Sequence, residues 1–253
     1  MGRTPLKIAL CIPCHRQTEA KFTQCLAEMI AHTMSAKIEY DGEMVTPQLE
    51  TIIVSCSLLT ESRNRLVAEA IHCEADYMLW MDADHVFPRD ALIQLLSHNL
   101  PVVGCNYARR LTPTAPTASV IEDGKKSLVW TTKEKADEGL IEKVGHLGLG
   151  LVLMDMRVYG LLEKKAEEEG REHFWPLFRI DPTEDGIAFI GEDVYFFQRL
   201  RDAGVPIYCD HGLSWNVGHL HEQILTNAHA EAQQDKWHHY RKHKLDKFKE
   251  TVE

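Results

Sequence analysis

Short apolar runs and longer segments with helical spacing alternate along the chain. The apolar runs predict strands that are buried on both faces of a sheet, at residues 7–12, 77–81, 102–105, 151–154 and 205–209. Shorter strands are expected at residues 38–40 and 51–55. Apolar positions three and four residues apart predict helices at residues 19–34, 63–73, 88–98, 156–169 and 192–204. This alternation predicts an α/β fold with a mostly parallel sheet flanked by helices.

Two segments have no clear periodic spacing of apolar residues and are expected to be turns or loops. The turn residues Glu122-Asp123-Gly124 predict a hairpin that continues into residues 128–131. Residues 210–221 predict a loop that leads into a helical tail. Because the chain has no internal repeat and no low-complexity linker, we expect one domain over residues 1–221 and a C-terminal helical extension over residues 222–253.

Composition narrows the class of protein. The 253 residues, 44% of them hydrophobic, are enough for one sizeable core. A formal charge of −10 argues against a surface built broadly for nucleic acid. The tail is a local exception, because residues 236–249 carry six Lys or Arg and one Asp, interleaved with aromatic residues.

The cysteines and the hydropathy of the sequence indicate where in the cell the protein is expected. Seven cysteines without a dense spacing pattern indicate reduced thiols rather than a disulfide framework. Cys11-x-x-Cys14 is a weak redox or zinc half-site, because no second pair at ligand spacing follows. No segment has the run of about 18 apolar residues that a membrane span needs. We therefore expect a cytoplasmic protein without a membrane span.

Two carboxylates one residue apart, Asp82 and Asp84, follow the apolar run at residues 77–81. Alternate side chains of an extended segment point the same way, so both carboxylates are expected to face one volume at the carboxyl edge of the sheet. Like charges held this close favour a cation between them, and oxygen ligands suit Mg²⁺ or Mn²⁺. A solvated turn is the alternative, because Asp is common where strands end.

Arg63 and Asn64 open a predicted helix that Thr60 or Ser62 would cap. An arginine in a first helical turn opposes the helix dipole, which favours an anion nearby, although an ordinary surface arginine fits as well. The glycines of Gly148-x-Gly150 precede a strand, the reverse of a dinucleotide-binding order. They predict a close backbone approach to a ligand or a neighbouring strand.

Taken together, these features resemble the GT-A superfamily of nucleotide-sugar glycosyltransferases, in particular the small family-2-like enzymes of bacteria and phages. The resemblance covers most of the chain to about residue 221. It depends on Arg63-Asn64, residues 77–84 (Tyr-Met-Leu-Trp-Met-Asp-Ala-Asp), 103–107 (Val-Gly-Cys-Asn-Tyr), Gly148-x-Gly150, 191–197 (Gly-Glu-Asp-Val-Tyr-Phe-Phe) with Arg199-Leu200, and Gly218-His219.

The resemblance implies a GT-A fold and a donor site that holds a nucleotide diphosphate-sugar and Mn²⁺ or Mg²⁺. Asp84 would bind the metal directly, Asp82 would share the metal or contact the ribose, and His219 would be a third ligand, with His221 as its competitor. The residues expected at the donor site are Pro13, Arg63, Asn64, Asp82, Ala83, Asp84 and Arg109.

Glu192 and Asp193 resemble the acidic pair on the acceptor side of the family, where one carboxylate takes the proton from the attacking hydroxyl. Their position at a helix N-terminus also has a structural explanation, because free N–H groups stabilise acidic side chains there. Those contacts would depress the pKa of the carboxylate and weaken it as a base. We expect Asp193 to be the base, with inversion favoured over retention.

Other functions fit parts of the pattern. A metal-dependent nucleotidyltransferase or phosphoryl transferase also uses paired carboxylates. A sugar- or nucleic-acid-binding module without activity would use the basic aromatic tail as its contact surface. For the transferase, the expected acceptor is a glycan or a small molecule, and the tail raises a modified base in DNA as a further candidate.

Overall fold

The computed structural model describes residues 6–40, 42–122, 125–173, 175–183, 188–221 and 224–252, and describes side chains up to residue 243. Its helices are α1 (Ala20–Ser35), α2 (Leu59–His72), α3 (Ala91–Ser97), α4 (Lys133–Asp137), α5 (Arg157–Glu168), α6 (Glu192–Asp202), α7 (His211–Trp215), α8 (Asn227–Ala232) and α9 (Gln234–Val252). Its strands are β1 (Lys7–Cys14), β2 (Ile38–Tyr40), β3 (Glu43–Val45), β4 (Gln48–Ser55), β5 (Tyr77–Met81), β6 (His85–Val86), β7 (Val102–Gly104), β8 (Ser119–Glu122), β9 (Lys125–Leu128), β10 (Ile141–Val144), β11 (Leu151–Asp155), β12 (Asp181–Pro182), β13 (Phe189–Ile190), β14 (Ile207–Asp210), β15 (Gly218–Leu220) and β16 (Ile224–Leu225).

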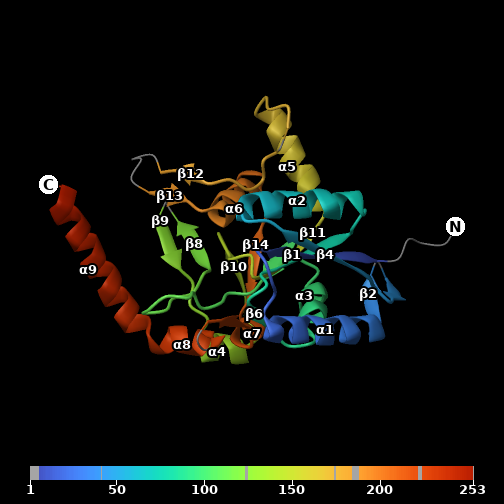
Figure 1. Cartoon of the computed structure of the whole chain (residues 1–253), viewed down its shortest axis with the longest axis horizontal. Coiled ribbons are helices and arrows are strands. Elements are labelled where there is room, and N and C mark those ends of the chain that lie inside the picture. The colour runs from blue at the N-terminus through green and yellow to red at the C-terminus, as the bar shows by residue number, and fades with distance from the viewer. Residues whose placement is uncertain are drawn as a thin grey trace.

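A seven-stranded sheet organises the fold, in the order β10-β14-β7-β11-β5-β1-β4 (Figure 1). The pairs β1–β4, β1–β5 and β7–β14 are parallel, whereas β11 is antiparallel to both of its neighbours and β10 to β14. Five of the seven strands therefore run in one direction. The predicted α/β class with a mostly parallel sheet flanked by helices is confirmed.

Helices cover both faces of the sheet, so its central strands are apolar on both sides. On β5, Met78 and Trp80 pack in the layer formed with α2, α5 and α6, whereas Leu79 and Met81 pack in the layer formed with α1 and α3. These four side chains are fully buried. The two-sided burial explains why the strand reads as a continuous apolar run.

Several element boundaries differ from those predicted. β1 continues through Pro13, which pairs with Val54 of β4. The pairing of β1 with β5 ends at Cys11, so Pro13, which has no N–H, does not have to donate a hydrogen bond to β5. Helix α2 begins four residues earlier than predicted, and α3 begins three residues after Pro88. The expected loop at residues 210–221 contains α7 and β15.

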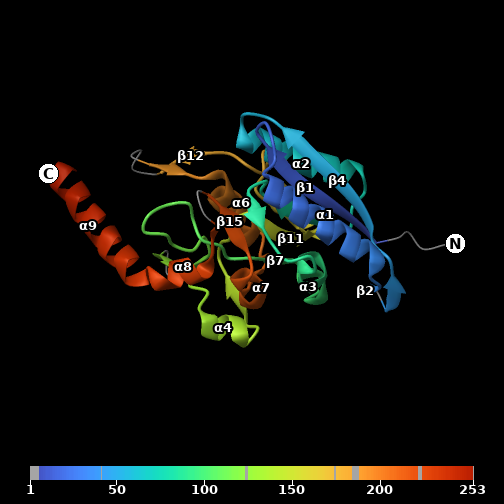
Figure 2. The same ribbon diagram turned by 60° about the horizontal axis from the view of Figure 1, so that its bottom comes forward.

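The predicted hairpin is present as β8 and β9, and its turn residues 123 and 124 lie outside the described residues. Beyond residue 223, β16 pairs with β15, and Asn227 of α8 donates to the carbonyls of Asn106 and Ser214. These contacts join α8 to the domain, and α9 points away from it (Figure 2). Among the described helices, none combines the length and hydropathy of a membrane span. The seven cysteines are free thiols.

Candidate functional site

The Asp82-Ala83-Asp84 segment follows β5 at the carboxyl edge of the sheet. It forms a turn, in which His85 N donates to Asp82 O at 3.3 Å, and Ala83 O accepts a hydrogen bond from the start of α1. The segment is not extended, and the two carboxylates have different partners. Asp82 pairs with Arg63, whereas Asp84 contacts two histidines. Asp82 is not in the group of possible metal ligands that contains Asp84, so its sharing of a metal stays a prediction.

Asp84, His85 and His219 form a group that could hold a metal ion, with ligand atoms within 4.8 Å of one another. Asp84 Oδ1 lies 3.1 Å from His85 Nδ1, and Asp84 Oδ2 lies 3.5 Å from His219 Nε2. Pairing of β15 with β6 sets His219 opposite His85, and their rings stack 4.4 Å apart. His221, the competing candidate, is exposed and is not in this group.

The hydrogen bonding of His219 fixes which ring nitrogen can bind a cation. His219 Nδ1 lies 3.0 Å from the carbonyl of Ala108, which can only accept, so Nδ1 carries the proton. In the neutral ring, Nε2 then presents its lone pair to Asp84 Oδ2. Two electron-pair donors facing each other at this distance favour a proton or a cation between them. Metal-binding histidines are commonly oriented in this way by a backbone carbonyl.

Charge at Asp84 is strongly stabilised. Burial opposes its ionisation, but the interactions with His219 and His85 outweigh burial and hold the pKa of Asp84 well below its ordinary value. Arg110 Nη1 adds an ion pair at 2.8 Å to Asp84 Oδ2, and the Arg110 side chain is half exposed. A cationic group thus already occupies this side of the carboxylate.

Arg63 joins the end of β5 to the start of α6. Its guanidinium lies 3.2 Å from Asp82 Oδ1 and 2.7 Å from Glu192 Oε1, and it is almost fully buried. Burial alone would lower the pKa of Arg63, but the two carboxylates raise it. Burial raises the pKa of Glu192, and Arg63 partly offsets this. Arg63 lies in the second turn of α2 rather than in the predicted first turn, and its anionic neighbours among the described residues include Asp82 and Glu192.

Asp193 is held in the first turn of α6. Its Oδ1 accepts from Val194 N at 2.7 Å, and its Oδ2 lies 3.5 Å from His146 Nε2, which has no other partner in the described residues. Burial raises the pKa of Asp193, but His146, Arg63 and the Val194 N–H outweigh burial and lower it to about 2. Burial lowers the pKa of His146, which Asp193 opposes. The pKa of Asp193 is therefore depressed, as predicted, but His146 contributes more to the depression than the N–H group at the helix start.

The two glycines before β11 make room for side chains of the site. A Cβ on Gly148 would lie 2.2 Å from Tyr107 Oη, and a Cβ on Gly150 would lie 2.4 Å from His85 Nε2. Gly150 N also donates to Tyr107 Oη at 3.2 Å. The predicted close backbone approach is confirmed, with the side chains of Tyr107 and His85 as the neighbours.

Three further candidates from the sequence have other surroundings. The side-chain amide of Asn64 donates to Thr60 O and Phe178 O and accepts from the Leu177 and Phe178 N–H groups, so it holds a loop. Pro13 is buried within β1. Arg109 interacts electrostatically with Asp193 and Tyr107, whereas its neighbour Arg110 contacts Asp84.

Sequence reasoning missed three residues of the site: His85, His146 and Tyr107. His85 directly follows Asp84, and this adjacency was the available signal. His146 and Tyr107 reach the site through contacts with Asp193 and His219, which lie 47 and 112 positions further along the chain. No local pattern encodes such contacts.

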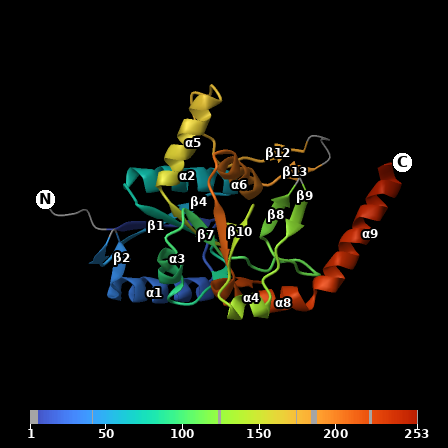
Figure 3. The same ribbon diagram turned by 180° about the vertical axis from the view of Figure 1, so that it is seen from behind.

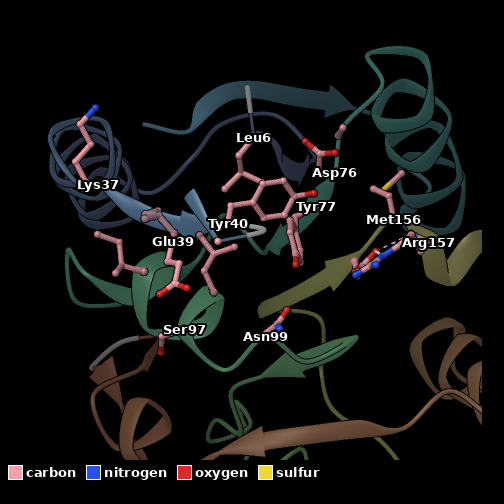
Figure 4. A pocket seen from close by; sticks show the side chains of 16 residues that line it. Leu6, Lys37, Glu39, Tyr40, Asp76, Tyr77, Ser97, Asn99, Met156 and Arg157 are labelled. Atoms are coloured by element: carbon pink, nitrogen blue, oxygen red, sulfur yellow. Dashed lines mark hydrogen bonds and ion pairs between the residues drawn. The ribbon is translucent and has the colours of Figure 1, made fainter. Parts of the chain in front are cut away.

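A cavity of about 960 Å³ lies at the opposite edge of the sheet, next to the starts of β1 and β5 (Figure 4). Tyr40 and Tyr77 line it with an edge-to-face contact, and Asp155 pairs with Arg157 beside them. None of the candidate residues lines this cavity. The candidate residues at the carboxyl edge therefore lie outside this cavity.

Comparison with known proteins gives a structural likeness only. No protein-family model matches the sequence, and no curated protein matches it. The fold is similar to the solved structure titled "Crystal Structure of A197 from STIV", with a TM-score of 0.52 and 14% sequence identity. The match covers 87% of this chain and 93% of that chain. A likeness at this identity shows the α/β fold and carries no statement about activity.

Proposed function

We propose that this protein is a metal-dependent glycosyltransferase of GT-A type, which moves a sugar from a nucleotide diphosphate-sugar to an acceptor hydroxyl in the cytoplasm. The observation that carries the proposal is the facing pair of Asp84 Oδ2 and His219 Nε2, 3.5 Å apart at the carboxyl edge of the sheet. Ligands of open α/β sheets bind at that edge. Asp193, a carboxylate held at the start of α6, supplies the second chemical group.

The donor set fits a divalent cation. Two atoms that bind one ion at about 2.1 Å each lie about 3 to 3.5 Å apart, which matches the observed separation. One carboxylate with imidazole nitrogen favours Mn²⁺ over Mg²⁺, because Mg²⁺ prefers oxygen and water. Asp84 and His219 would hold the ion, with His85 orienting Asp84. When bound, the ion neutralises charge on the diphosphate leaving group.

The surrounding residues bind and orient the donor. Arg63 fixes Asp82, whose remaining carboxylate oxygen can accept from a ribose hydroxyl. Arg110 is half exposed and pairs with Asp84, so it is free to transfer to a donor phosphate when a cation takes its place. Pro13 and Ala83 contribute backbone at the same edge.

Asp193 accepts the proton of the attacking hydroxyl in this proposal. A pKa of about 2 makes Asp193 a weak base that is fully ionised near neutral pH. A weak base suffices if the proton leaves late, after the new C–O bond has made the hydroxyl acidic. Direct attack by the acceptor hydroxyl gives inversion, which we favour.

A donor panel tests the proposal. With Mn²⁺ and UDP-, GDP-, CDP- or dTDP-sugars, we expect one donor to be hydrolysed slowly to free sugar and nucleoside diphosphate, and Asp84→Asn to abolish the reaction. Release of pyrophosphate would indicate nucleotidyl transfer instead. Binding of a nucleotide sugar without any turnover would indicate a binding module and contradict the proposal.

A further inference from the structure

The cavity of about 960 Å³ at the starts of β1 and β5 has no part in the proposed transfer. Its lining comes from β2, the start of β5, α3 and the end of β11 (Figure 4). Viewed from behind, β2 and α1 lie at the end of the molecule opposite α9 (Figure 3). Pockets for small organic ligands measure about 300 to 1,000 Å³, so a molecule of that kind fits here.

Two tyrosines form a corner in this lining. The ring centroids of Tyr40 and Tyr77 lie 6.3 Å apart with an angle of 71° between the ring planes, and the two rings lie together at the centre of the lining (Figure 4). Tyr77 is only 6% exposed, and its hydroxyl makes no hydrogen bond with the residues that the structure describes. A buried tyrosine hydroxyl normally has a partner. The Tyr77 hydroxyl is therefore available to a ligand in the cavity.

Asp155 lies beside Tyr77, because β11 runs antiparallel to β5 and pairs its last residue with the first residue of β5. Arg157 donates to the Asp155 carboxylate from its backbone N at 2.8 Å and from its Nε at 2.9 Å. This pair brings little net charge. Burial raises the pKa of Tyr77, and Asp155 and Asp76 raise it further against the opposing effect of Arg157. The potential at the Tyr77 hydroxyl is therefore negative.

The other charged groups of the lining leave the cavity negative. Glu39 and Asp76 line it, and neither makes an ion pair with a residue that the structure describes. Asp76 Oδ2 accepts a hydrogen bond from the backbone N–H of Lys7 at 2.8 Å, which does not neutralise its charge. The remaining cation, Lys37, points away from the two tyrosine rings (Figure 4).

Helix ends add to this negative potential. Helix α1 ends at Ser35, just before Lys37, and Ser97 at the end of α3 lines the cavity. The C-terminal end of a helix carries a partial negative charge. Helix α5 begins at the cavity with the opposite polarity, but the N–H of its first residue, Arg157, is taken by Asp155.

The lining selects one class of ligand. A single metal ion does not fit, because the group of close candidate ligands found among the described residues lies at Asp84 and not here. A phosphate does not fit, because the unpaired charges of the lining are carboxylates. Leu6, Ile93 and Leu96 supply apolar surface, which suits the carbon atoms of an organic molecule.

We propose that this cavity binds a small organic cation. The rings of Tyr40 and Tyr77 receive its ammonium group, because the face of a tyrosine ring attracts a cation. Glu39 and Asp76 compensate its charge, and the apolar residues contact its carbon chain. The proposal does not depend on the glycosyl transfer, because the metal-binding group lies at the other edge of the sheet.

Binding of simple ammonium compounds tests the cavity. The probes are choline, which carries a quaternary ammonium, and putrescine, which carries primary ammonium groups. Dimethylbutanol, in which carbon replaces the nitrogen of choline, is the uncharged control of the same shape. Ligand-observed NMR with the whole protein measures each affinity. We expect choline or putrescine to bind and dimethylbutanol to bind at least about tenfold more weakly.

Substitutions in the lining locate the bound cation. Glu39→Gln and Asp76→Asn should each weaken binding of the cation about fivefold, because each removes one attractive charge. Tyr40→Leu should weaken it about tenfold, whereas Tyr40→Phe keeps the ring and should stay within about twofold of the parent. Glu50→Gln is the matched control, because it removes the same charge from an exposed strand position outside the lining. It should leave binding unchanged.

The outcomes separate this proposal from the proposed function. Asp84→Asn should leave cation binding unchanged, and a loss in that variant would place the cation at the metal-binding group and overturn the proposal. Binding of neither cation, equal binding of choline and dimethylbutanol, or an equal loss in Glu50→Gln would also overturn it. Cation binding in a protein that hydrolyses no nucleotide sugar would support this proposal and remove the glycosyl transfer alone.

Discussion

Asp84 Oδ2 and His219 Nε2 face each other 3.5 Å apart, and the carbonyl of Ala108 holds the only ring proton of the neutral His219 on its other nitrogen. A proton or a metal ion can therefore fill the same position. The two compete, because a protonated Nε2 cannot bind a metal. The charge state of this pair therefore decides whether it can hold a metal ion.

The first prediction concerns this pair. Asp84→Asn and His219→Gln should each weaken Mn²⁺ binding by at least about 100-fold, because each removes one strong ligand atom. Isothermal titration calorimetry with Mn²⁺ measures the effect. Asp137→Asn is the control, since this exposed carboxylate lies on α4 and pairs only with Lys133 among the described residues. Unchanged affinity in both site variants would refute the assignment.

The second prediction concerns the buried ion pairs of Arg63. Arg63→Met keeps most of the volume but leaves Asp82 and Glu192 without their cation in a poorly solvated place. We expect the free energy of unfolding to fall by about 3 to 5 kcal/mol, as measured by urea denaturation. Arg65→Met changes an exposed residue of the same helix and should cost less than about 0.5 kcal/mol. A similar small loss in Arg63→Met would show that the pairs are not needed for stability.

The sheet was predictable from sequence because its signal is local. β5 and β11 are buried on both faces, and five consecutive buried positions in each leave a continuous apolar run. The start of α2 was misplaced because no side chain caps it: the N-cap position is Leu58. Sequence reasoning relied on Thr60 and Ser62, which lie inside the helix.

The site was predicted in part. Asp84 and His219 are predicted from sequence and lie together, but the predicted pairing of Asp82 with Asp84 assumes an extended segment. The segment after β5 instead forms a turn, and Asp82 pairs with Arg63, 19 positions earlier in the chain. Contacts between residues so far apart in the chain leave no periodic pattern in the sequence from which they could be predicted. His146 was missed for the same reason.

The third prediction concerns the pH dependence of Asp193. The folded pKa of about 2 lies below the ordinary value of 3.8, so the ionised carboxylate contributes stability above pH 4 that is lost as the pH falls toward 2. In His146→Leu the main stabilising contact is gone while burial remains, so the pKa of Asp193 should rise. We expect the acid limb of kcat/KM for the proposed transfer to move to higher pH.

Comparison of pH profiles at saturating Mn²⁺ checks this shift. His72→Leu, which alters an exposed histidine at the end of α2, serves as the control and should keep the parent profile. An acid limb that stays in place in His146→Leu would show that Asp193 does not limit the reaction, and Glu192 would then be the carboxylate to test.

The fourth prediction uses two glycines in different surroundings. In Gly150→Ala the new Cβ would lie 2.4 Å from His85 Nε2, a distance that forces the ring or the start of β11 to move. His85 is fully buried and stacked on His219, so the His85 ring cannot move without displacing His219 or Asp84. We expect a loss of about 1 to 3 kcal/mol in unfolding free energy and at least about tenfold weaker Mn²⁺ binding.

Gly160→Ala, in α5 with no atom within 4 Å of its Cβ, should instead stabilise the protein by about 0.5 to 1 kcal/mol and leave Mn²⁺ binding unchanged. Urea denaturation and Mn²⁺ titration of both variants measure these effects. Equal changes in the two variants would show that the close packing of Gly150 against His85 is not needed for Mn²⁺ binding.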